Sequence, residues 1–309
     1  MSNNSPDTDV SDMDYKIPPF LIPATDITRL EPFYNGSGGL GDVWKCSMSV
    51  SAKSVKSTKS KESAKSELVA VKSIRIIESN DEALVTKARR AIRKEAYVWI
   101  LLSHDRILPL KGVTEGFGKL PALVAPWMEN GSLNDYLRRE HSKLSGHQKL
   151  ELIQEVAAGL SYLHVDVHEE GIVHGDLTGT NVLVDGSGHI RLADFGLSII
   201  LSRADSITFS SCHVGNMRWM APDVLALDMP TKMGDIYSYG CVALQVFSGH
   251  QPYEGLKSVF AVTMAMTQGR APFAVMNEDG LDERLTSGCF KTAEERLTIQ
   301  DIMGILGLQ

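Results

Sequence analysis

The sequence has little cysteine and no close cysteine pair. Its 309 residues contain four scattered cysteines, none of them in a C-x-x-C motif: Cys46, Cys212, Cys241 and Cys289. Because this spacing does not suggest a disulfide framework, we expect reduced thiols. The expected location is intracellular, in the cytoplasm or the nucleus.

Long apolar runs and a strong excess of one charge are also missing. The longest apolar run, at 236–247, is too short to span a bilayer, and we expect a buried core helix there. Residues 1–14 have no apolar stretch typical of a secretory signal. The net charge of −7 argues against nucleic-acid or anionic-membrane binding. The remaining composition, 43% hydrophobic and 22% charged, is that of a globular protein.

Two polar motifs frame a short predicted hairpin in the second half of the chain. Residues 174–181 read H-G-D-L-T-G-T-N, and residues 194–196 read D-F-G. Two apolar runs between them flank a Gly-rich reversal at 186–188, which predicts a β-hairpin. The hairpin would bring Asp176, Asn181 and Asp194 together. Two carboxylates and an amide oxygen form a ligand set that suits Mg²⁺ carrying the phosphates of a nucleotide.

Both motifs resemble the protein-kinase catalytic loop, H-R-D-x-x-x-x-N, and its D-F-G. Residues 215–223 read G-N-M-R-W-M-A-P-D and resemble the G-T-x-x-W-M-A-P-E segment of tyrosine-kinase-like kinases, and residues 235–240 match D-x-Y-S-x-G. The ordered set is similar to a eukaryotic protein kinase domain of the tyrosine-kinase-like group and serine/threonine type. This resemblance implies a bilobal α+β fold, with a small β-rich N-lobe carrying one helix and a larger, mainly helical C-lobe.

The resemblance also predicts how the chain is divided. We expect a kinase domain at 28–309, with the N-lobe at 28–128 and the C-lobe at 129–309. Residues 1–16 are poor in apolar side chains, which predicts a disordered tail. Residues 47–66 are almost all Ser, Lys, Ala, Thr and Val, which predicts a solvated insertion between two strands. A basic docking tract or a phosphorylated serine cluster is the alternative for this segment.

A glycine-rich segment near the N-terminus fits the pattern G-x-G-x-x-G-x-V. Glycines allow backbone N–H groups to approach phosphates where a Cβ would intrude. Residues 43–46 look like a strand, whereas a dinucleotide-binding turn would require a helix there. We therefore expect a hairpin lid over ATP, and the resemblance implies that four of its residues contact the nucleotide: Gly36, Gly38, Gly41 and Val43.

The strand predicted at 68–72 matches the kinase V-A-I-K pattern. The resemblance implies that Lys72 neutralises the nucleotide phosphates and that Ala70 lines the same site. A lysine on an apolar strand needs a partner, and Glu95 on a helix predicted over about 81–102 is the candidate. The alternative for Glu95 is a solvent-facing acid on a charged helix.

Strands predicted at 110–115 and 122–127 lead into a segment that resembles the kinase hinge, which meets adenine. Pro126 and Met128 would flank this hinge, and Ala125 would be the gatekeeper residue. Because Ala125 is small, we expect a void behind the adenine that admits bulky ATP-competitive ligands. Apolar residues then recur at helical spacing from 150 to 163, which predicts an amphipathic core helix.

The resemblance assigns roles at the predicted site. Asp176 would orient the substrate hydroxyl and accept its proton, and Asn181 and Asp194 would bind Mg²⁺. ATP and Mg²⁺ are the implied cofactors, and a protein is the implied substrate. Asp235 would brace the backbone of the catalytic loop.

Two further structural expectations concern histidines and a C-lobe ion pair. Three histidines lie near the catalytic loop, but their spacing matches no zinc pattern. We expect His174 to pack in an apolar stack with Phe195, Leu110 and Trp99. Asp223 and Arg296 should form a buried ion pair.

Three positions depart from the kinase pattern. Gly175 replaces an arginine that grips a phosphate on the activation loop, which makes control through residues 197–212 a weaker expectation. Thr178 replaces a lysine that meets the γ-phosphate, and Asn216 replaces a Thr or Ser. The leading hypothesis is an active protein kinase that transfers the γ-phosphoryl group of ATP to a Ser or Thr hydroxyl, with a Tyr hydroxyl as the alternative acceptor. The alternatives are a nucleotide-binding pseudokinase scaffold and, with less support, a small-molecule phosphotransferase.

Overall fold

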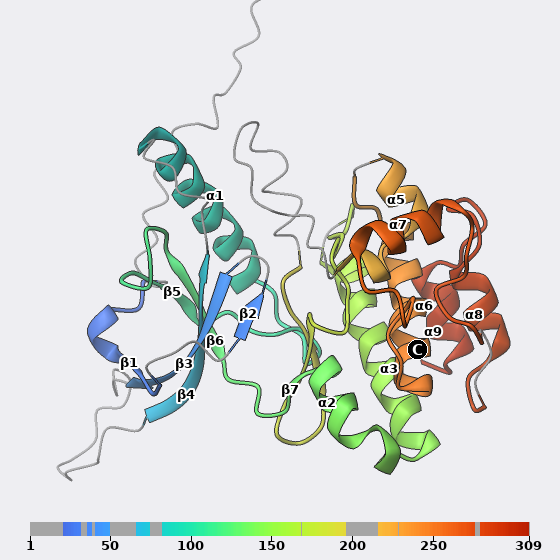
Figure 1. Cartoon of the computed structure of the whole chain (residues 1–309). Helices are drawn as coiled ribbons and strands as arrows, with labels where there is room; N and C mark the ends of the chain where they lie inside the picture. The colour runs from blue at the N-terminus through green and yellow to red at the C-terminus, as the bar shows by residue number, and fades with distance from the viewer. Residues whose placement is uncertain are drawn as a thin grey trace, which may run out of the picture.

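Figure 1 shows the strands of the first third of the chain gathered on one side and most of the helices on the other. This arrangement confirms the predicted bilobal α+β fold. The computed structural model describes residues 21–31, 36–38, 41–49, 66–74, 82–167, 169–195, 216–227, 229–275 and 279–308. The predicted tail at 1–16, the interior of the insertion and the segment 197–212 lie outside these residues.

The N-lobe is one antiparallel sheet with a single long helix. Its strands are β1 (Ile27–Arg29), β2 (Gly36–Gly38), β3 (Gly41–Ser49), β4 (Ser66–Ile74), β5 (Gly112–Thr114) and β6 (Ala122–Pro126), and its helix is α1 (Glu82–Ile100). The strand order is β1-β3-β4-β6-β5, and β2 pairs with β3. Leu21, which precedes β1, forms a β-bridge with Val113 of β5. The described fold therefore begins before residue 28, the predicted start of the domain.

The boundary predicted for the insertion, at residue 47, is wrong. Strand β3 continues to Ser49, and the register pairs Met48 with Glu67 and Ser49 with Ser66. Main-chain hydrogen bonds hold this part of the hairpin together, and they do not depend on apolar side chains. A composition change therefore locates the end of the strand too early.

The two faces of the N-lobe sheet have different neighbours, because successive side chains of a strand point to opposite faces. One face carries Val69 and Val71, which pack in a small buried cluster with Ile27 of β1 and with Ile22, which precedes β1. Cys46 belongs to this cluster, and burial raises the pKa of its thiol to about 11, so the thiol stays protonated. The opposite face carries Ala70 and Lys72 and is the face on which the predicted nucleotide residues lie.

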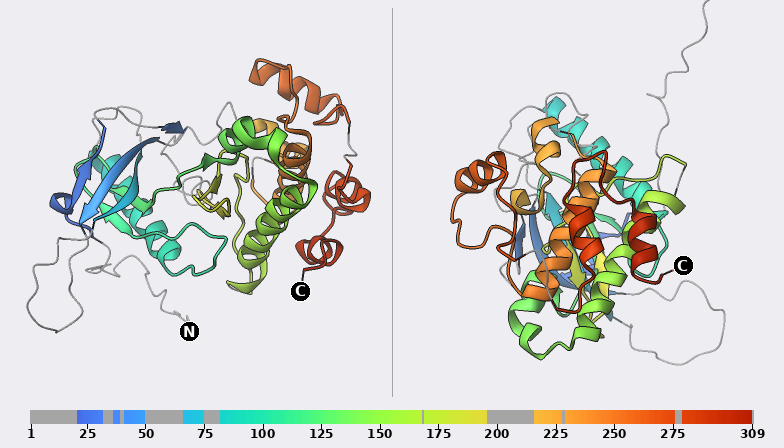
Figure 2. Two further views of the ribbon diagram at one scale, coloured as in Figure 1. Left: turned by 90° about the horizontal axis from the view of Figure 1, so that it is seen from below. Right: turned by 90° about the vertical axis from the view of Figure 1, so that its right-hand side faces the viewer.

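The C-lobe is mainly helical. Its elements are β7 (Gly131–Ser132), α2 (Leu133–Glu140), α3 (Gly146–Ser161), β8 (Val182–Val184), β9 (Ile190–Leu192), α5 (Pro222–Leu227), α6 (Lys232–Ser248), α7 (Val259–Thr267), α8 (Glu283–Cys289) and α9 (Ile299–Ile305). The strands form a second sheet in the order β7-β8-β9. The turned views in Figure 2 place α8 and α9 on the side of this lobe away from the N-lobe strands.

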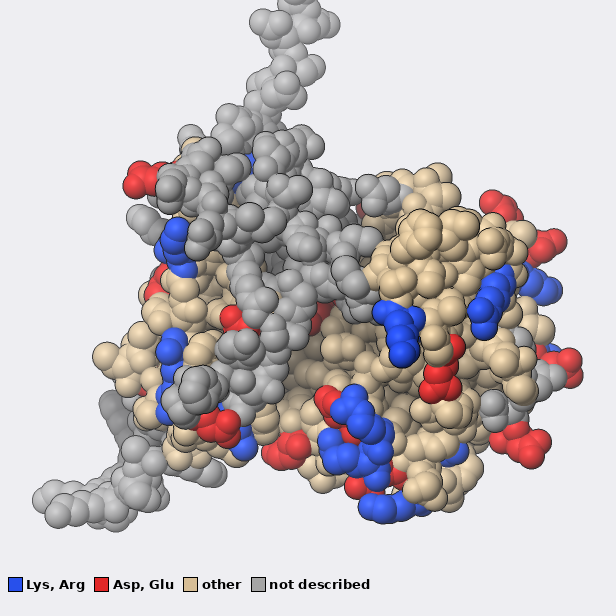
Figure 3. Space-filling view, viewed as in Figure 1, with Lys and Arg blue, Asp and Glu red and all other residues tan. Residues whose placement is uncertain are grey.

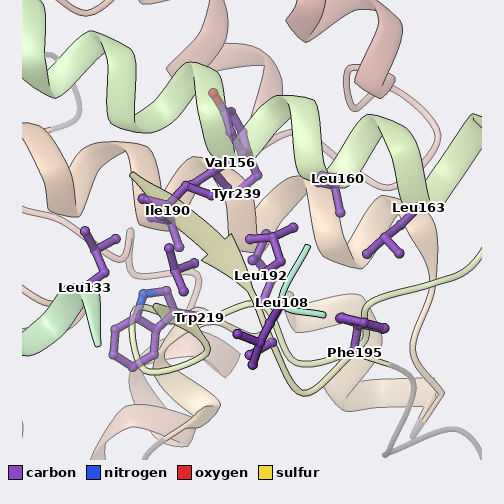
Figure 4. Close-up of a cluster of buried hydrophobic side chains, with 14 of the residues drawn as sticks. Leu108, Leu133, Val156, Leu160, Leu163, Ile190, Leu192, Phe195, Trp219 and Tyr239 are labelled. Carbon is purple, nitrogen blue, oxygen red and sulfur yellow. The ribbon is translucent and has the colours of Figure 1, made fainter. Parts of the chain in front are cut away.

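Helices α3 and α6 and strand β9 enclose the centre of the C-lobe core. In Figure 4, Val156 and Leu160 of α3 lie near Tyr239 of α6, with Leu192 of β9 beside them, and all four are fully buried. The predicted buried helix at 236–247 is confirmed within α6. It begins earlier, at Lys232, because the Thr231 hydroxyl accepts a hydrogen bond from the Gly234 N–H and caps the helix.

The predicted ion pair between Asp223 and Arg296 is also confirmed. The Arg296 Nη2 lies 2.7 Å from the Asp223 Oδ1, and its Nη1 donates to the Met233 carbonyl at 2.6 Å. The pair therefore ties α5 to the segment between α8 and α9. Among the helices of the described ranges, none is both long and apolar enough to cross a lipid bilayer.

Candidate active site

The catalytic-loop backbone is held by one buried carboxylate at the start of α6. The Asp235 Oδ2 accepts the His174 N–H at 2.8 Å, and its Oδ1 accepts the Gly175 N–H at 2.9 Å. This confirms the predicted brace. The His164 Nε2 also lies 2.8 Å from the Asp235 Oδ2, a contact that sequence reasoning missed because the two residues are 71 positions apart. Gly175 has a φ of 77°, which glycine adopts without strain.

His174 packs in the ring stack that the sequence predicted. Its side chain is fully buried, its ring centroid lies 6.1 Å from that of Phe195, and Phe195 lies 5.4 Å from Trp99. Burial lowers the pKa of the His174 imidazole below its ordinary value, so the ring stays neutral near pH 7. Leu110 is buried in the same core cluster.

Asn181 joins the catalytic loop to the hairpin. Its side-chain amide donates to the Asp176 carbonyl at 2.8 Å and to the Asp176 Oδ2 at 2.7 Å. Its own carbonyl accepts the Ala193 N–H at 2.9 Å, and the β8–β9 register pairs Val182 with Leu192. The predicted hairpin is therefore confirmed, and it places Asn181 across from the residue that precedes Asp194.

Lys72 is paired across the two lobes. Its Nζ lies 2.5 Å from the Asp194 Oδ2, and the two side chains are only 15% and 20% exposed. Sequence reasoning expected Glu95 as the partner of Lys72. The side chain of Glu95 lies outside what the structure describes, so that pairing stays a prediction. Asp194 has a φ of 59°, an uncommon backbone conformation for a residue with a side chain.

The predicted nucleotide-binding residues of the sheet lie on one face. The register pairs Val43 with Lys72, and Ala70 with Ala125. Since paired residues of adjacent strands point to the same face, these four side chains share the face that carries Lys72.

The predicted Gly-rich hairpin is present. Strands β2 and β3 pair Gly36 with Val43 and Gly38 with Gly41, and the tip at 39–40 lies outside the described ranges. A Cβ on Gly41 would lie 1.8 Å from the Ser73 carbonyl oxygen. Close packing against β4 therefore requires a glycine at this position, a reason that the sequence did not reveal.

The hinge follows β6. Ala125 and Met128 are 6% and 8% exposed and belong to the main core cluster, and Pro126 is the last residue of β6. The Met128 carbonyl accepts the Gly131 N–H at 3.1 Å. The Met128 N–H donates to no backbone carbonyl of the described residues. This leaves it as a donor for a ligand such as adenine.

Thr178 lies inside the catalytic loop and presents no positive charge. It is 1% exposed, and its hydroxyl accepts the N–H groups of Thr180 and Asn181, both at 3.3 Å. The side chain therefore stabilises the turn that positions Asn181. The side chain of the other departing residue, Asn216, lies outside what the structure describes.

A polar network behind the loop was not anticipated. The Asn134 side chain donates to the Thr180 hydroxyl at 3.0 Å and accepts from Gln245 at 2.6 Å. Gln245 in turn accepts the Trp219 indole N–H at 3.1 Å. Nothing in the sequence spacing of these residues indicates that they meet, because they come from different elements.

A small pocket lies beside the catalytic loop. Asp176 and Thr178 form part of its lining, and Trp219, Met220 and Pro230 supply apolar walls.

The oxygen atoms of the site are suitable ligands for a hard divalent cation. Within the described residues, the Asn181 Oδ1 and the Asp194 Oδ1 accept no hydrogen bond, whereas the other polar atom of each side chain is engaged. Amide and carboxylate oxygens are the ligands that Mg²⁺ prefers. The site thus combines two available oxygen ligands, one ammonium group and a carboxylate held by Asn181.

Comparison with known proteins agrees with this geometry. A family model described as protein tyrosine and serine/threonine kinase matches residues 35–306. An L-type lectin-domain containing receptor kinase from Oryza sativa subsp. japonica is 36% identical over 49% of this chain and 22% of its own length. A probable serine/threonine-protein kinase from Dictyostelium discoideum is 28% identical over 66% of this chain and 21% of its own length. Ephrin type-A receptor 7 from Gallus gallus is 28% identical over 77% of this chain and 23% of its own length. The chain therefore spans less than a third of the length of these relatives.

Proposed function

Because the chain belongs to the protein tyrosine and serine/threonine kinase family, we propose that it transfers the γ-phosphoryl group of ATP to a Ser or Thr hydroxyl of a protein. The observation that carries this proposal is the linked set of side chains at the site: Asp176 bonded to Asn181, and Lys72 paired with Asp194. A carboxylate near the acceptor and an ammonium near the phosphates are the parts that this reaction needs.

Asn181 and Asp194 would hold Mg²⁺ through the oxygens that accept no hydrogen bond from the described residues. When bound, the ion neutralises phosphate charge and so favours transfer. Lys72 adds a second positive charge for the phosphates. Because its side chain is largely buried, its attraction for phosphate is less screened than that of a surface lysine.

Asp176 would accept the proton of the attacking hydroxyl. As the new oxygen–phosphorus bond forms, the bond from the γ-phosphorus to the leaving oxygen of ADP breaks. The Asn181 amide bonds to the Asp176 Oδ2 at 2.7 Å and fixes the orientation of this carboxylate. Positioning of this kind supplies much of the rate in phosphoryl transfer.

The charge distribution of the described surface suits a protein substrate better than a nucleic acid. Among the described residues on the face seen in Figure 3, basic and acidic side chains are interspersed, and no broad patch of one sign dominates. This agrees with the net charge of −7. A serine or threonine acceptor is supported by the name of one relative and by the tyrosine-kinase-like form of residues 215–223.

A pseudokinase scaffold is the second candidate, and Thr178 favours it. This side chain is buried and neutral where the family resemblance leads us to expect a lysine at the γ-phosphate. A site without that cation could bind ATP and transfer its phosphate slowly or not at all.

Phosphate transfer from radiolabelled ATP distinguishes the two candidates. The full chain is incubated with Mg²⁺ and a general protein substrate such as casein, and Asp176→Asn is compared with the wild type. We expect Asp176→Asn to lower the rate by about 10²- to 10⁴-fold, the usual contribution of a general base. The matched control Asp166→Asn changes an exposed acid and should leave the rate unchanged. Equal incorporation by the wild type and Asp176→Asn would favour the scaffold.

A further inference from the structure

A cluster of three charged side chains joins α1 to the end of β5, outside the site described above. The Arg89 Nη1 lies 3.2 Å from the Glu115 Oε1, and the Arg93 Nη2 lies 3.6 Å from the same oxygen. The Arg89 Nη2 also donates to the Lys119 carbonyl at 2.5 Å. We call Glu115 with these two arginines the α1 clamp.

The α1 clamp borders the buried side of the helix. Ala88 and Ile92 are fully buried, and Arg89 and Arg93 follow them by one position each. Residues four apart lie one above the other on a helix, so the two arginines form a row beside the buried row. Bonds along one edge of a helix oppose its rotation about its own axis.

The other end of α1 contacts the active site. Trp99 is 5% exposed, its indole N–H donates to the Leu108 carbonyl at 2.6 Å, and its ring lies against Phe195. Phe195 directly follows Asp194, which pairs with Lys72. A rotation of α1 would therefore be transmitted through Trp99 and Phe195 to the ion pair that faces the nucleotide.

The α1 clamp also connects α1 to a part of the sheet that is fixed independently. Val113 lies two residues before Glu115, and its carbonyl accepts the Ile22 N–H at 2.8 Å. Strand β5 pairs with β6, which leads into the hinge. Glu115 thus connects α1 to the end of β5, and β5 is hydrogen-bonded through β6 to β4, the strands that carry Ala125 and Lys72.

We propose that Glu115 is a positioning residue: by holding Arg89 and Arg93, it fixes the rotation of α1 and so keeps Trp99 against Phe195, beside the Lys72–Asp194 pair. The functional part of this inference rests on the proposed binding of MgATP. The positional part does not, and the test separates the two.

The first measurement follows Trp99 directly. The full chain is labelled with 5-fluorotryptophan, its four tryptophans are resolved by ¹⁹F NMR, and Trp99→Phe assigns the relevant resonance. We expect Glu115→Gln to shift or split the Trp99 resonance. The matched control is Glu67→Gln, which removes the ion pair of Glu67 with Lys111 in the same lobe. Glu67 is 35% exposed and Glu115 is 37% exposed, so a general loss of surface charge affects both variants alike.

The second measurement is the affinity for MgATP by isothermal titration calorimetry. We expect Glu115→Gln to weaken binding by about fivefold, which corresponds to ~1 kcal/mol, while Glu67→Gln leaves the affinity unchanged. The triple variant Arg89→Glu with Arg93→Glu and Glu115→Arg reverses both pairs of the α1 clamp and should recover most of the lost affinity and the original Trp99 resonance.

The outcomes are distinct. If Glu115→Gln matches Glu67→Gln in both measurements, the inference is wrong. If the charge reversal fails to restore the Trp99 resonance, the effect of Glu115 does not pass through the α1 clamp, and the inference is also wrong. If the wild type binds no MgATP, the proposed function fails, and the Trp99 resonances alone decide the positional role.

Discussion

Thr178 shows how one side chain can replace a charge with a structural role. A lysine at this position would extend toward the phosphates, whereas the threonine hydroxyl turns inward and accepts two backbone N–H groups of the loop. These N–H groups belong to Thr180 and Asn181, so the hydroxyl stabilises the turn that presents Asn181. The loop loses a cation and retains its shape.

Removing this hydroxyl should destabilise the protein. Thr178→Val keeps the shape of the side chain but leaves the Thr180 N–H without its acceptor, whereas the Asn181 N–H keeps the Thr178 carbonyl at 3.0 Å, so we expect a loss of about 1 kcal/mol. Thr178→Ser keeps the acceptor and should lose less. Urea unfolding measures both variants, and a Thr178→Val protein as stable as the wild type would show that the two 3.3 Å contacts contribute little.

His174 makes stability depend on pH. Burial lowers the pKa of the folded imidazole, while the unfolded imidazole binds a proton near its ordinary pKa of about 6.5. Below that pH the unfolded state binds more protons, so the free energy of unfolding falls as the pH drops, by at most about 1.4 kcal/mol per pH unit. At pH 7 and above this contribution to stability is fully present.

The variant His174→Phe removes the titrating group and keeps a ring in the stack. Urea unfolding between pH 7 and pH 5, above the range in which carboxylates titrate, gives the slope of stability against pH for both proteins. We expect a shallower slope for His174→Phe. Equal slopes would mean that the ring takes up its proton equally in the folded and unfolded states.

At the scale of elements, α6 organises the C-lobe. Nearly all of its residues are buried, and Asp235 in its first turn orients the catalytic loop. The Thr231 cap fixes where the helix begins and therefore where Asp235 lies. The pair of Asp223 and Arg296 holds α5 and the segment ahead of α9 around this helix.

Breaking that pair should be costly. The Arg296 side chain is 2% exposed and also donates to two backbone carbonyls, so Arg296→Met leaves several acceptors without a donor. Asp223 is 27% exposed, which moderates the penalty of leaving it unpaired. We expect a loss of about 2–4 kcal/mol in the free energy of unfolding, measured in urea. Arg284→Met breaks an exposed pair with Asp282 and should leave the unfolding midpoint nearly unchanged. Similar losses in the two variants would contradict the role of burial.

For the whole molecule, local patterns in the sequence predicted the elements well. The reversal at 186–188 predicted a hairpin, and the β8–β9 register confirms it. The apolar spacing at 150–163 predicted α3, although a capping box at Ser145 starts the helix earlier. These features depend on neighbouring residues, so a single sequence contains the information needed to find them.

Contacts between distant segments were predicted only where a family motif supplied them. The Asp235 brace and the pair of Asp223 and Arg296 came from the resemblance. The contacts of Glu115 with Arg89, of Asn134 with Thr180, and of Lys72 with Asp194 were missed. Each depends on how two elements pack, and no local pattern indicates that these particular side chains meet.

The central claim is that Lys72, Asp194 and Asn181 together bind the phosphates of ATP with Mg²⁺. Calorimetric titration of the full chain with ATP, with Mg²⁺ present, tests it most directly when the wild type is compared with Lys72→Met. We predict saturable binding by the wild type and affinity lowered by at least about tenfold in Lys72→Met, the equivalent of ~1.4 kcal/mol. Equal affinity in the two proteins, or no binding by the wild type, would contradict the account.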